Sequence, residues 1–285
     1  MTSTLQRGRC ARAGALRRLG VAAVAVLSVA ACGSSGATSA RPSASPTSHA
    51  ASVAVVAIGD SDATGAGDAS GRGWVGRYGD LLKQRLGVPV NVDNEAAEGK
   101  TSEQLRGEVA ADEALRTKLA HADVILIGIG GADLNAGDDA LSAGPCKGRQ
   151  CYADVLRTFD TNIGAIAHDV RQVAPSALLR AMSLPNALPG AGAAVPLSPR
   201  VSAATAADLG RYQVTAERAS VCRAMASYDG RCVDVVRAFN GANAGGDAYT
   251  TGLMTKDPCC YPSADGQQLI AKLLLAAGVG DLPHH

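Results

Sequence analysis

The residues best suited to chemistry are a serine and an aspartate that follow a short apolar run. The run Val53–Ile58 has the composition of a buried strand, and the turn Gly59-Asp60-Ser61 ends it. A serine hydroxyl held at the end of a strand can act as a nucleophile when a neighbouring group takes its proton. A turn containing Ser and Asp is also common in loops without any catalytic role. The motif alone is therefore a weak indication of an active site.

Apolar runs of strand length alternate with segments of helical spacing along the rest of the chain. We expect strands at 53–58, 88–92, 123–129, 177–182 and 231–236, and helices at 74–86, 98–119, 155–173, 203–228 and 266–277. Continuous apolar strands alternating with helices predict a parallel sheet covered on both faces. The expected fold is therefore α/β, a three-layer sandwich with a central parallel sheet of about five strands.

In such a sheet the working residues gather at the carboxyl ends of the strands. Four segments fall there, and they resemble in order the motif blocks of the GDSL (SGNH) hydrolases, a family of serine esterases and lipases. The segments are Gly59-Asp60-Ser61-Asp62, Asn94–Gly99, Gly130-Gly131-Ala132-Asp133 and Asp257–Gln267. The resemblance covers about residues 53–280. It implies the flavodoxin-like fold of that family and hydrolysis of a lipid, glycan or small acyl ester.

The resemblance also implies roles for individual residues. Ser61 matches the nucleophile, and the backbone N–H groups of Ser61 and Gly99 would bind the oxyanion. Asp60, Ala132 and Asp133 would belong to the surrounding pocket. The catalytic residues on this basis are Ser61, Asp257 and Tyr261.

Two signature residues of the family are replaced. Ala132 stands where an Asn would donate to the oxyanion, and Tyr261 stands where the catalytic His is expected. Loss of one oxyanion donor typically costs about 3–4 kcal/mol of transition-state stabilisation, and loss of the triad base can reduce turnover by roughly 10⁶. Tyr is a poor base because its reference pKa is about 10. Asp257, four residues before Tyr261 rather than three, would act as a weakened base through water or with Tyr261.

No histidine of the sequence takes the missing position. His49 lies in the expected tether, His121 precedes the third expected strand and His168 falls within an expected helix. His284 and His285 lie in the C-terminal tail. Asn135 lies two positions after the place where the family's Asn is expected, and it could supply the oxyanion donor after a shift of the loop.

Because the expected His and Asn are replaced, the alternative function is a catalytically inactive lipoprotein of the same fold that serves as a binding or scaffolding module.

The first 31 residues have the pattern of a secretory signal peptide. Five Arg precede the 13-residue apolar run Leu19–Ala31, which would cover roughly 20 Å as a helix against a bilayer core of about 30 Å. The run ends in Val29-Ala30-Ala31-Cys32, which resembles the lipobox of bacterial lipoproteins. We expect lipidation of Cys32 and an extracytoplasmic location at the bacterial cell membrane. Residues 32–52 would form a flexible tether rich in Ser, Ala, Thr and Pro, and 53–285 a single domain.

Export favours disulfides over metal binding for the remaining cysteines. These are Cys146, Cys151, Cys222, Cys232, Cys259 and Cys260. The local pairs Cys146–Cys151 and Cys222–Cys232 are expected. The adjacent Cys259 and Cys260 must bond to each other or pair elsewhere.

Composition limits the classes of partner. Hydrophobic residues make up 47% and charged residues 19%, which excludes a disordered chain. Without the five Arg of the leader, the rest of the chain has 22 Lys and Arg residues and 26 Asp and Glu residues, a net charge of −4. This charge argues against a nucleic-acid partner. Gly99-Lys100-Thr101 nearly matches a phosphate-binding loop, but Glu95 and Glu98 would repel phosphate. We therefore expect no metal and no cofactor. The expected partners are a small-molecule, lipid or glycan ester and the membrane reached through Cys32.

Overall fold

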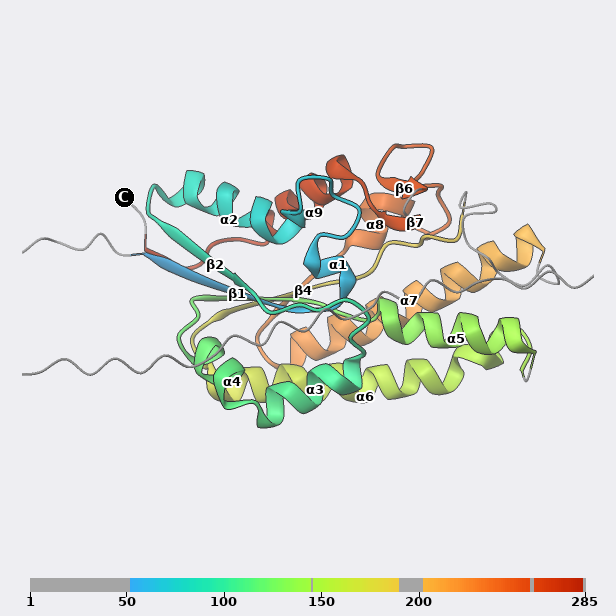
Figure 1. Cartoon of the computed structure of the whole chain (residues 1–285), viewed down its shortest axis with the longest axis horizontal. Helices are drawn as coiled ribbons and strands as arrows, with labels where there is room; N and C mark the ends of the chain where they lie inside the picture. Colours follow the sequence, from blue (N-terminus) through green and yellow to red (C-terminus); the bar gives the residue numbers. More distant parts are fainter. Residues whose placement is uncertain (1–51, 145, 190–201, 257–258, 284–285) are drawn as a thin grey trace, which may run out of the picture. The chain divides into compact units, whose positions relative to one another are not determined.

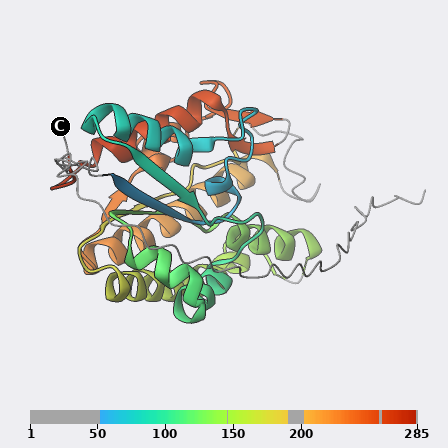
Figure 2. The ribbon, with the colours of Figure 1, turned by 60° about the vertical axis from the view of Figure 1, so that its left-hand side comes forward.

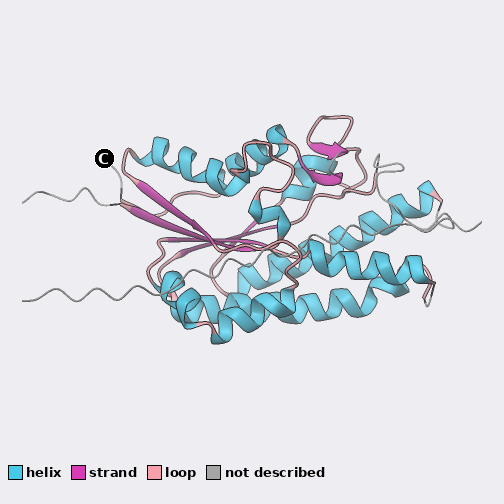
Figure 3. Cartoon of the chain, viewed as in Figure 1, coloured by secondary structure: helices cyan, strands magenta, loops and turns pink. Residues whose placement is uncertain are grey.

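A parallel β-sheet forms the middle layer of the fold (Figure 1, Figure 3). The computed structural model describes residues 52–144, 146–189, 202–256 and 259–283. Within them the sheet has five strands in the order β2-β1-β3-β4-β5, and every neighbouring pair is parallel. The strands are β1 (Val53–Gly59), β2 (Val90–Asn94), β3 (Val124–Gly128), β4 (Leu178–Met182) and β5 (Arg231–Val233). The predicted α/β sandwich is confirmed.

Helices cover both faces of this sheet (Figure 1, Figure 2). One face carries α2 (Gly73–Leu86), α8 (Val235–Asn240) and α9 (Ala264–Ala276). The other carries α3 (Ser102–Ala111), α4 (Glu113–Ala120), α6 (Gln150–Val173) and α7 (Ala203–Ser227), and α5 (Gly131–Ala143) packs on α6. The described residues all belong to a single compact unit.

Side chains of the central strands enter the two helical layers alternately. Val55 and Ala57 of β1 belong to the core shared with α2 and α9, whereas Val56 and Ile58 belong to the core shared with α3 and α6. Because both faces of β1 and β3 are buried, these two strands show no polar alternation in the sequence. They could therefore be recognised as continuous apolar runs, whereas the edge strand β2 alternates Val with Asn and Asp and is largely exposed.

The structure corrects several predicted boundaries. The helix expected over 98–119 is two helices, α3 and α4, and the Asp112 carboxylate between them caps α4 by accepting from the N–H groups of Ala114 and Leu115. The strand expected over 231–236 ends at Val233, because Asp234 caps α8. Helix α5 and the hairpin β6 (Met254–Lys256) and β7 (Cys259–Pro262) were not predicted.

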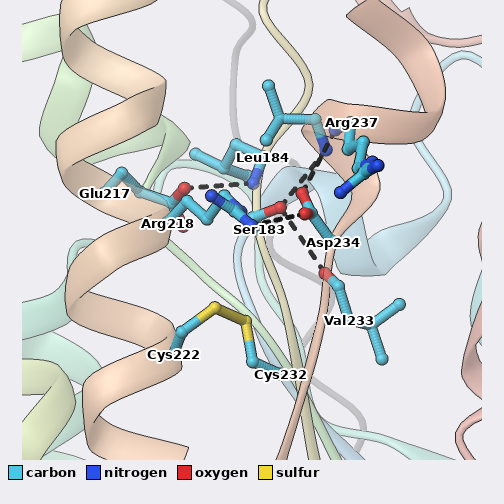
Figure 4. Close-up of a disulfide and its surroundings, with 10 residues drawn as sticks. Ser183, Leu184, Glu217, Arg218, Cys222, Cys232, Val233, Asp234 and Arg237 are labelled. Atoms are coloured by element: carbon cyan, nitrogen blue, oxygen red, sulfur yellow. Dashed lines mark hydrogen bonds and ion pairs between the residues drawn. A yellow bond between two sulfur atoms is a disulfide. The ribbon is translucent and has the colours of Figure 1, made fainter. Parts of the chain in front are cut away.

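Both predicted local disulfides are present. Cys146 bonds to Cys151 just before α6, and Cys222 bonds to Cys232 and thereby joins α7 to the edge strand β5 (Figure 4). Cys260 is also disulfide-bonded.

The predicted leader 1–31, the lipidated Cys32 and the tether up to residue 51 lie outside the described residues. Among the helices that are described, none has the length and apolar character needed to cross a bilayer.

Candidate active site

Ser61 owes its position to an unusually close approach of β1 and β3. Gly59 ends β1 with φ of +153°, and a Cβ at this position would lie 1.8 Å from the carbonyl oxygen of Gly128. Only glycine fits so tight a contact. The Asp60 N–H donates to the same Gly128 carbonyl at 2.9 Å, and the chain then turns into the short helix α1 (Ser61–Thr64). Ser61 is therefore the first helical residue after the strand.

The Asp60 side chain ties this turn to the start of α5. Its carboxylate is fully buried and accepts backbone N–H groups from Asp62 at 3.1 Å, Gly130 at 2.9 Å and Gly131 at 2.8 Å. The first and third motif segments are thus joined by one side chain. Asp60 lies beneath the pocket that Ser61 faces, not among the residues that line it.

Asp133 joins the third segment to the start of α3, which follows the second segment. Its carboxylate accepts the Ser102 N–H at 2.9 Å and the Ser102 hydroxyl at 2.6 Å, and Asn162 Nδ2 donates to that hydroxyl at 3.0 Å. These bonds fix the first turn of α3. Neither Asp133 nor its neighbour Ala132, both expected in the pocket, is among the residues that line it, and the contacts of Asp133 give it a structural role at the start of α3.

Ser61 opens onto a pocket of about 300 Å³. Its walls come from α1, α5, the segment after β4, α7 and the hairpin strand β7. The lining side chains that matter for chemistry are Ser61, Asp62, Asn135, Asp138, Gln213 and Tyr261. The structure therefore brings Ser61 and Tyr261 to one cavity, whereas Asp257 lies outside the described residues.

Gly99 lies in the loop after β2 and does not line this pocket. It is exposed, with φ of +72°, and the loop is held to the end of β1 by the Ala97 N–H, which donates to the Gly59 carbonyl at 3.1 Å. Neither the Ser61 N–H nor the Gly99 N–H donates to an acceptor within the described part of the chain. Both N–H groups are available for another acceptor.

The two histidines that the structure describes are remote from Ser61. His121 contacts the Thr117 carbonyl at the end of α4, and His168 pairs with Asp169 on α6; both are exposed. No histidine is among the described residues that line the pocket. Asn135, noted in the sequence as a possible late donor, does line it.

Gln267 holds the loop after Ser61 and was not singled out from the sequence. It is fully buried, accepts the Trp74 N–H at 2.8 Å and donates to the carbonyls of Ala66 at 3.1 Å and Pro262 at 3.3 Å. Trp74 Nε1 in turn donates to the Asp62 carbonyl at 2.7 Å. Helices α2 and α9 together therefore fix the turn that presents the serine.

Three buried carboxyl groups lie under and beside the pocket. Burial raises the pKa of Asp60 to about 6, against the opposing effect of its backbone donors. Burial and the nearby Asp60 raise the pKa of Asp62 to about 8. Burial also raises the pKa of Glu217 on α7 well above its usual range, and this carboxyl accepts only the Leu184 N–H, at 3.2 Å (Figure 4). These shifts favour the negative charge on Asp60 and the protonated forms of Asp62 and Glu217.

Of Asp62 and Glu217, only Asp62 lines the pocket. A signal for Asp62 existed in the sequence, because it is an acid one residue after the candidate nucleophile. No local signal marks Glu217, which comes from a helix more than 150 residues away along the chain. Within the described residues no three metal-ligating side chains are grouped.

A parallel α/β sheet that presents a serine at the end of its first strand, above a pocket at the carboxyl edge, defines a serine-hydrolase type of fold and site. The chain belongs to the GDSL-like Lipase/Acylhydrolase family, whose model matches residues 57–269.

Solved structures of lipases share this fold. A lipase from a goat rumen metagenome, Lip_vut3, superposes with a TM-score of 0.65 at 18% identity, covering 80% of this chain and 99% of the lipase. An extracellular lipase from Streptomyces rimosus superposes with a TM-score of 0.59 at 18% identity, covering 79% of this chain and 100% of that lipase. A curated Bacillus subtilis protein, YpmR, is 35% identical over 83 residues; the match spans 29% of this chain and about a third, 32%, of that relative.

Replacing Gln267 by Leu should lower the free energy of unfolding by about 2–5 kcal/mol. The change leaves the Trp74 N–H and two carbonyls without partners, and each unsatisfied buried group costs about 1–3 kcal/mol. Urea denaturation measures the loss. The matched control is Gln268→Leu on the same helix, where the side chain is half-buried and should matter little. Equal stability of the two variants would contradict this role of Gln267.

Replacing Glu217 by Gln should change how stability depends on pH. The folded-state pKa of Glu217 is raised, so the unfolded chain loses this proton first and wild-type stability falls as pH rises above about 4.5. The Gln variant lacks this penalty. Its stability relative to wild type should increase between pH 4 and pH 7 by about 1.4 kcal/mol for each pKa unit of the shift.

Thermal and denaturant unfolding at several pH values checks this expectation. Glu113→Gln, at an exposed position of α4, serves as the control and should give a difference that does not vary with pH. A Glu217→Gln difference that stays constant with pH would show that folding does not raise the pKa of Glu217.

Proposed function

We propose that the protein is an exported serine ester hydrolase of low turnover, held at the membrane by a lipid on Cys32. One observation carries the catalytic part: Ser61 follows β1 directly and faces a pocket of about 300 Å³ with its own backbone N–H unpaired in the described structure. The family and its lipase members support an ester as substrate. The signal-peptide pattern and the lipobox at Cys32 support export and anchoring.

The reaction would proceed through an acyl-enzyme. Ser61 Oγ bonds to the acyl carbon while its proton passes to Asp257, through water or with Tyr261, and the carbonyl electron pair moves onto the oxygen. The Ser61 N–H binds that oxyanion; the resemblance also assigns the Gly99 N–H to it, although Gly99 lies in a loop outside the pocket lining. Collapse of the oxyanion releases the alcohol, which takes up the proton. Water then attacks the acyl carbon, frees the carboxylic acid and restores the Ser61 hydroxyl.

The pocket suits a small ester with a polar group. Leu134, Leu184 and Val214 supply apolar walls, whereas Asn135 and Gln213 offer amide groups to hydroxyl or carbonyl oxygens. A short acyl chain on a small alcohol, a glycan or a lipid head would fit these dimensions and this chemistry.

A binding or scaffolding role is the second candidate. The observation that favours it is the pocket lining, which holds no histidine among its described residues. A protein with this role would keep the cavity and bind its ligand without forming a covalent intermediate at Ser61.

Labelling by a fluorophosphonate probe separates the two functions. The full-length chain should form an adduct on Ser61, located by mass spectrometry, and Ser61→Ala should remove it. An active esterase of the same family is the positive control. Absence of the adduct under conditions that label the control would favour the binding role.

Tyr261→His should increase hydrolysis of a short-chain nitrophenyl ester by at least tenfold. The change places an imidazole, with a reference pKa of about 6.5, in the same cavity as Ser61. Tyr261→Phe is the matched control, because it keeps the ring but offers no base. An unchanged rate in Tyr261→His would mean that position 261 does not point its side chain at the Ser61 proton.

A further inference from the structure

Asp62 is the least explained side chain of the pocket. It is only 9% exposed, yet it contributes to the lining next to Ser61. Its backbone is fully used, since its N–H donates to Asp60 and its carbonyl accepts from Trp74. Its carboxyl group receives no hydrogen bond from any described residue. A buried carboxyl without a donor is costly as an anion and stable as a neutral acid.

Burial, and then the charge of Asp60, raise the pKa of Asp62. Asp60 accepts the N–H groups of Asp62, Gly130 and Gly131, which stabilise its charged form, and that charge repels a second charge on Asp62. Glu217 adds a further acid from α7, and Asp138 on α5 and Tyr261 on β7 face the same cavity. No Lys or Arg is among the described residues that line it. An O–H donor is therefore present in the pocket near neutral pH.

This donor lies beside the place where a family donor is missing. The Oδ2 atom of Asp62 is 3.4 Å from the position that a Cβ on Gly131 would occupy. Gly131 directly precedes Ala132, whose methyl group stands where an Asn amide is expected. The Asp62 carboxyl thus reaches the segment from which the amide has been lost.

We propose that the Asp62 carboxyl donates its proton in a hydrogen bond to the substrate oxyanion, in place of the amide absent at Ala132. The inference rests on the proposed ester hydrolysis and adds a catalytic residue to it. The proton stays on Asp62 throughout, and only the hydrogen bond strengthens as the carbonyl oxygen gains charge. A carboxylic acid kept neutral by its surroundings is an effective oxyanion donor.

The competing role for Asp62 is that of the base for Ser61. Adjacent residues of a helix do not face each other, and Ser61 and Asp62 are the first two residues of α1. The two roles predict opposite pH profiles. A donor loses activity as it ionises, near pH 8, whereas a base gains it.

Two replacements of similar size distinguish the roles. Asp62→Asn keeps a donor that does not titrate, so it should stay within tenfold of wild type and lose the decline of activity above pH 8. Asp62→Leu removes the donor and should lower kcat/KM roughly 10²- to 10³-fold, as loss of one oxyanion donor does elsewhere. In the Asp62→Leu background, Ala132→Asn should recover at least tenfold by restoring the family amide.

Several outcomes would overturn the inference. One is a loss in Asp62→Asn as large as that in Asp62→Leu, and another is a wild-type activity that rises through pH 8. Unfolding midpoints of the full-length variants identify any misfolded protein, and the wild-type pH profile decides between the roles even if a variant does not fold.

A binding measurement keeps the test independent of turnover. If hydrolysis by the wild-type chain does not depend on Ser61, the proposed function fails. The donor at Asp62 can then still be tested with butyrate as the probe, because its carboxylate resembles the oxyanion. Wild type and Asp62→Asn should bind butyrate at least tenfold more tightly than Asp62→Leu, and wild type should lose this advantage above pH 8. Equal affinities in all three proteins would refute a donor at Asp62.

Discussion

The buried Asp60 carboxylate is the interaction on which the rest of the site depends. It accepts backbone N–H groups from Asp62, Gly130 and Gly131, and so connects the end of β1 with the start of α5. Two parallel strands bring these segments together, and the shared carboxylate ties them to each other beside the Asp60 N–H bond to Gly128. Those donors stabilise the charged form of Asp60. The group therefore helps to position Ser61, and its charge adds to the effect of burial on the pKa of Asp62.

The remaining contacts extend the same principle across the carboxyl edge of the sheet. Asp133 holds the start of α3 through Ser102, and Gln267 holds the loop after Ser61 through Trp74. Each is a buried polar group with its partners supplied by a distant segment. Such bonds contribute little net energy each, but breaking one leaves an unsatisfied group. They therefore specify the geometry of the site more than they stabilise the fold.

The site combines an intact frame with an altered chemistry. The close contact of β1 with β3 and the capped helices hold the serine turn in place, while Ala132 and Tyr261 stand where the resemblance to the family predicts an amide and an imidazole. The described lining of the cavity holds two carboxyl groups, Asp62 and Asp138. Burial raises the pKa of both, and Asp138 accepts hydrogen bonds from Tyr152 and Gln213, whereas Asp62 receives none from the described residues.

The sequence by itself determined the central strands β1 and β3, because both of their faces are buried and each is a continuous apolar run. It also determined the order of the motif segments and the two local disulfides, since these depend on residues close together in the chain. It missed α5 and the β6–β7 hairpin, whose short or weakly patterned segments are stabilised by packing. Only the tertiary structure decided that the pKa of Asp62 is raised, because this shift depends first on burial and then on the charge of Asp60. Desolvation is a property of the assembled fold, and local sequence does not encode it.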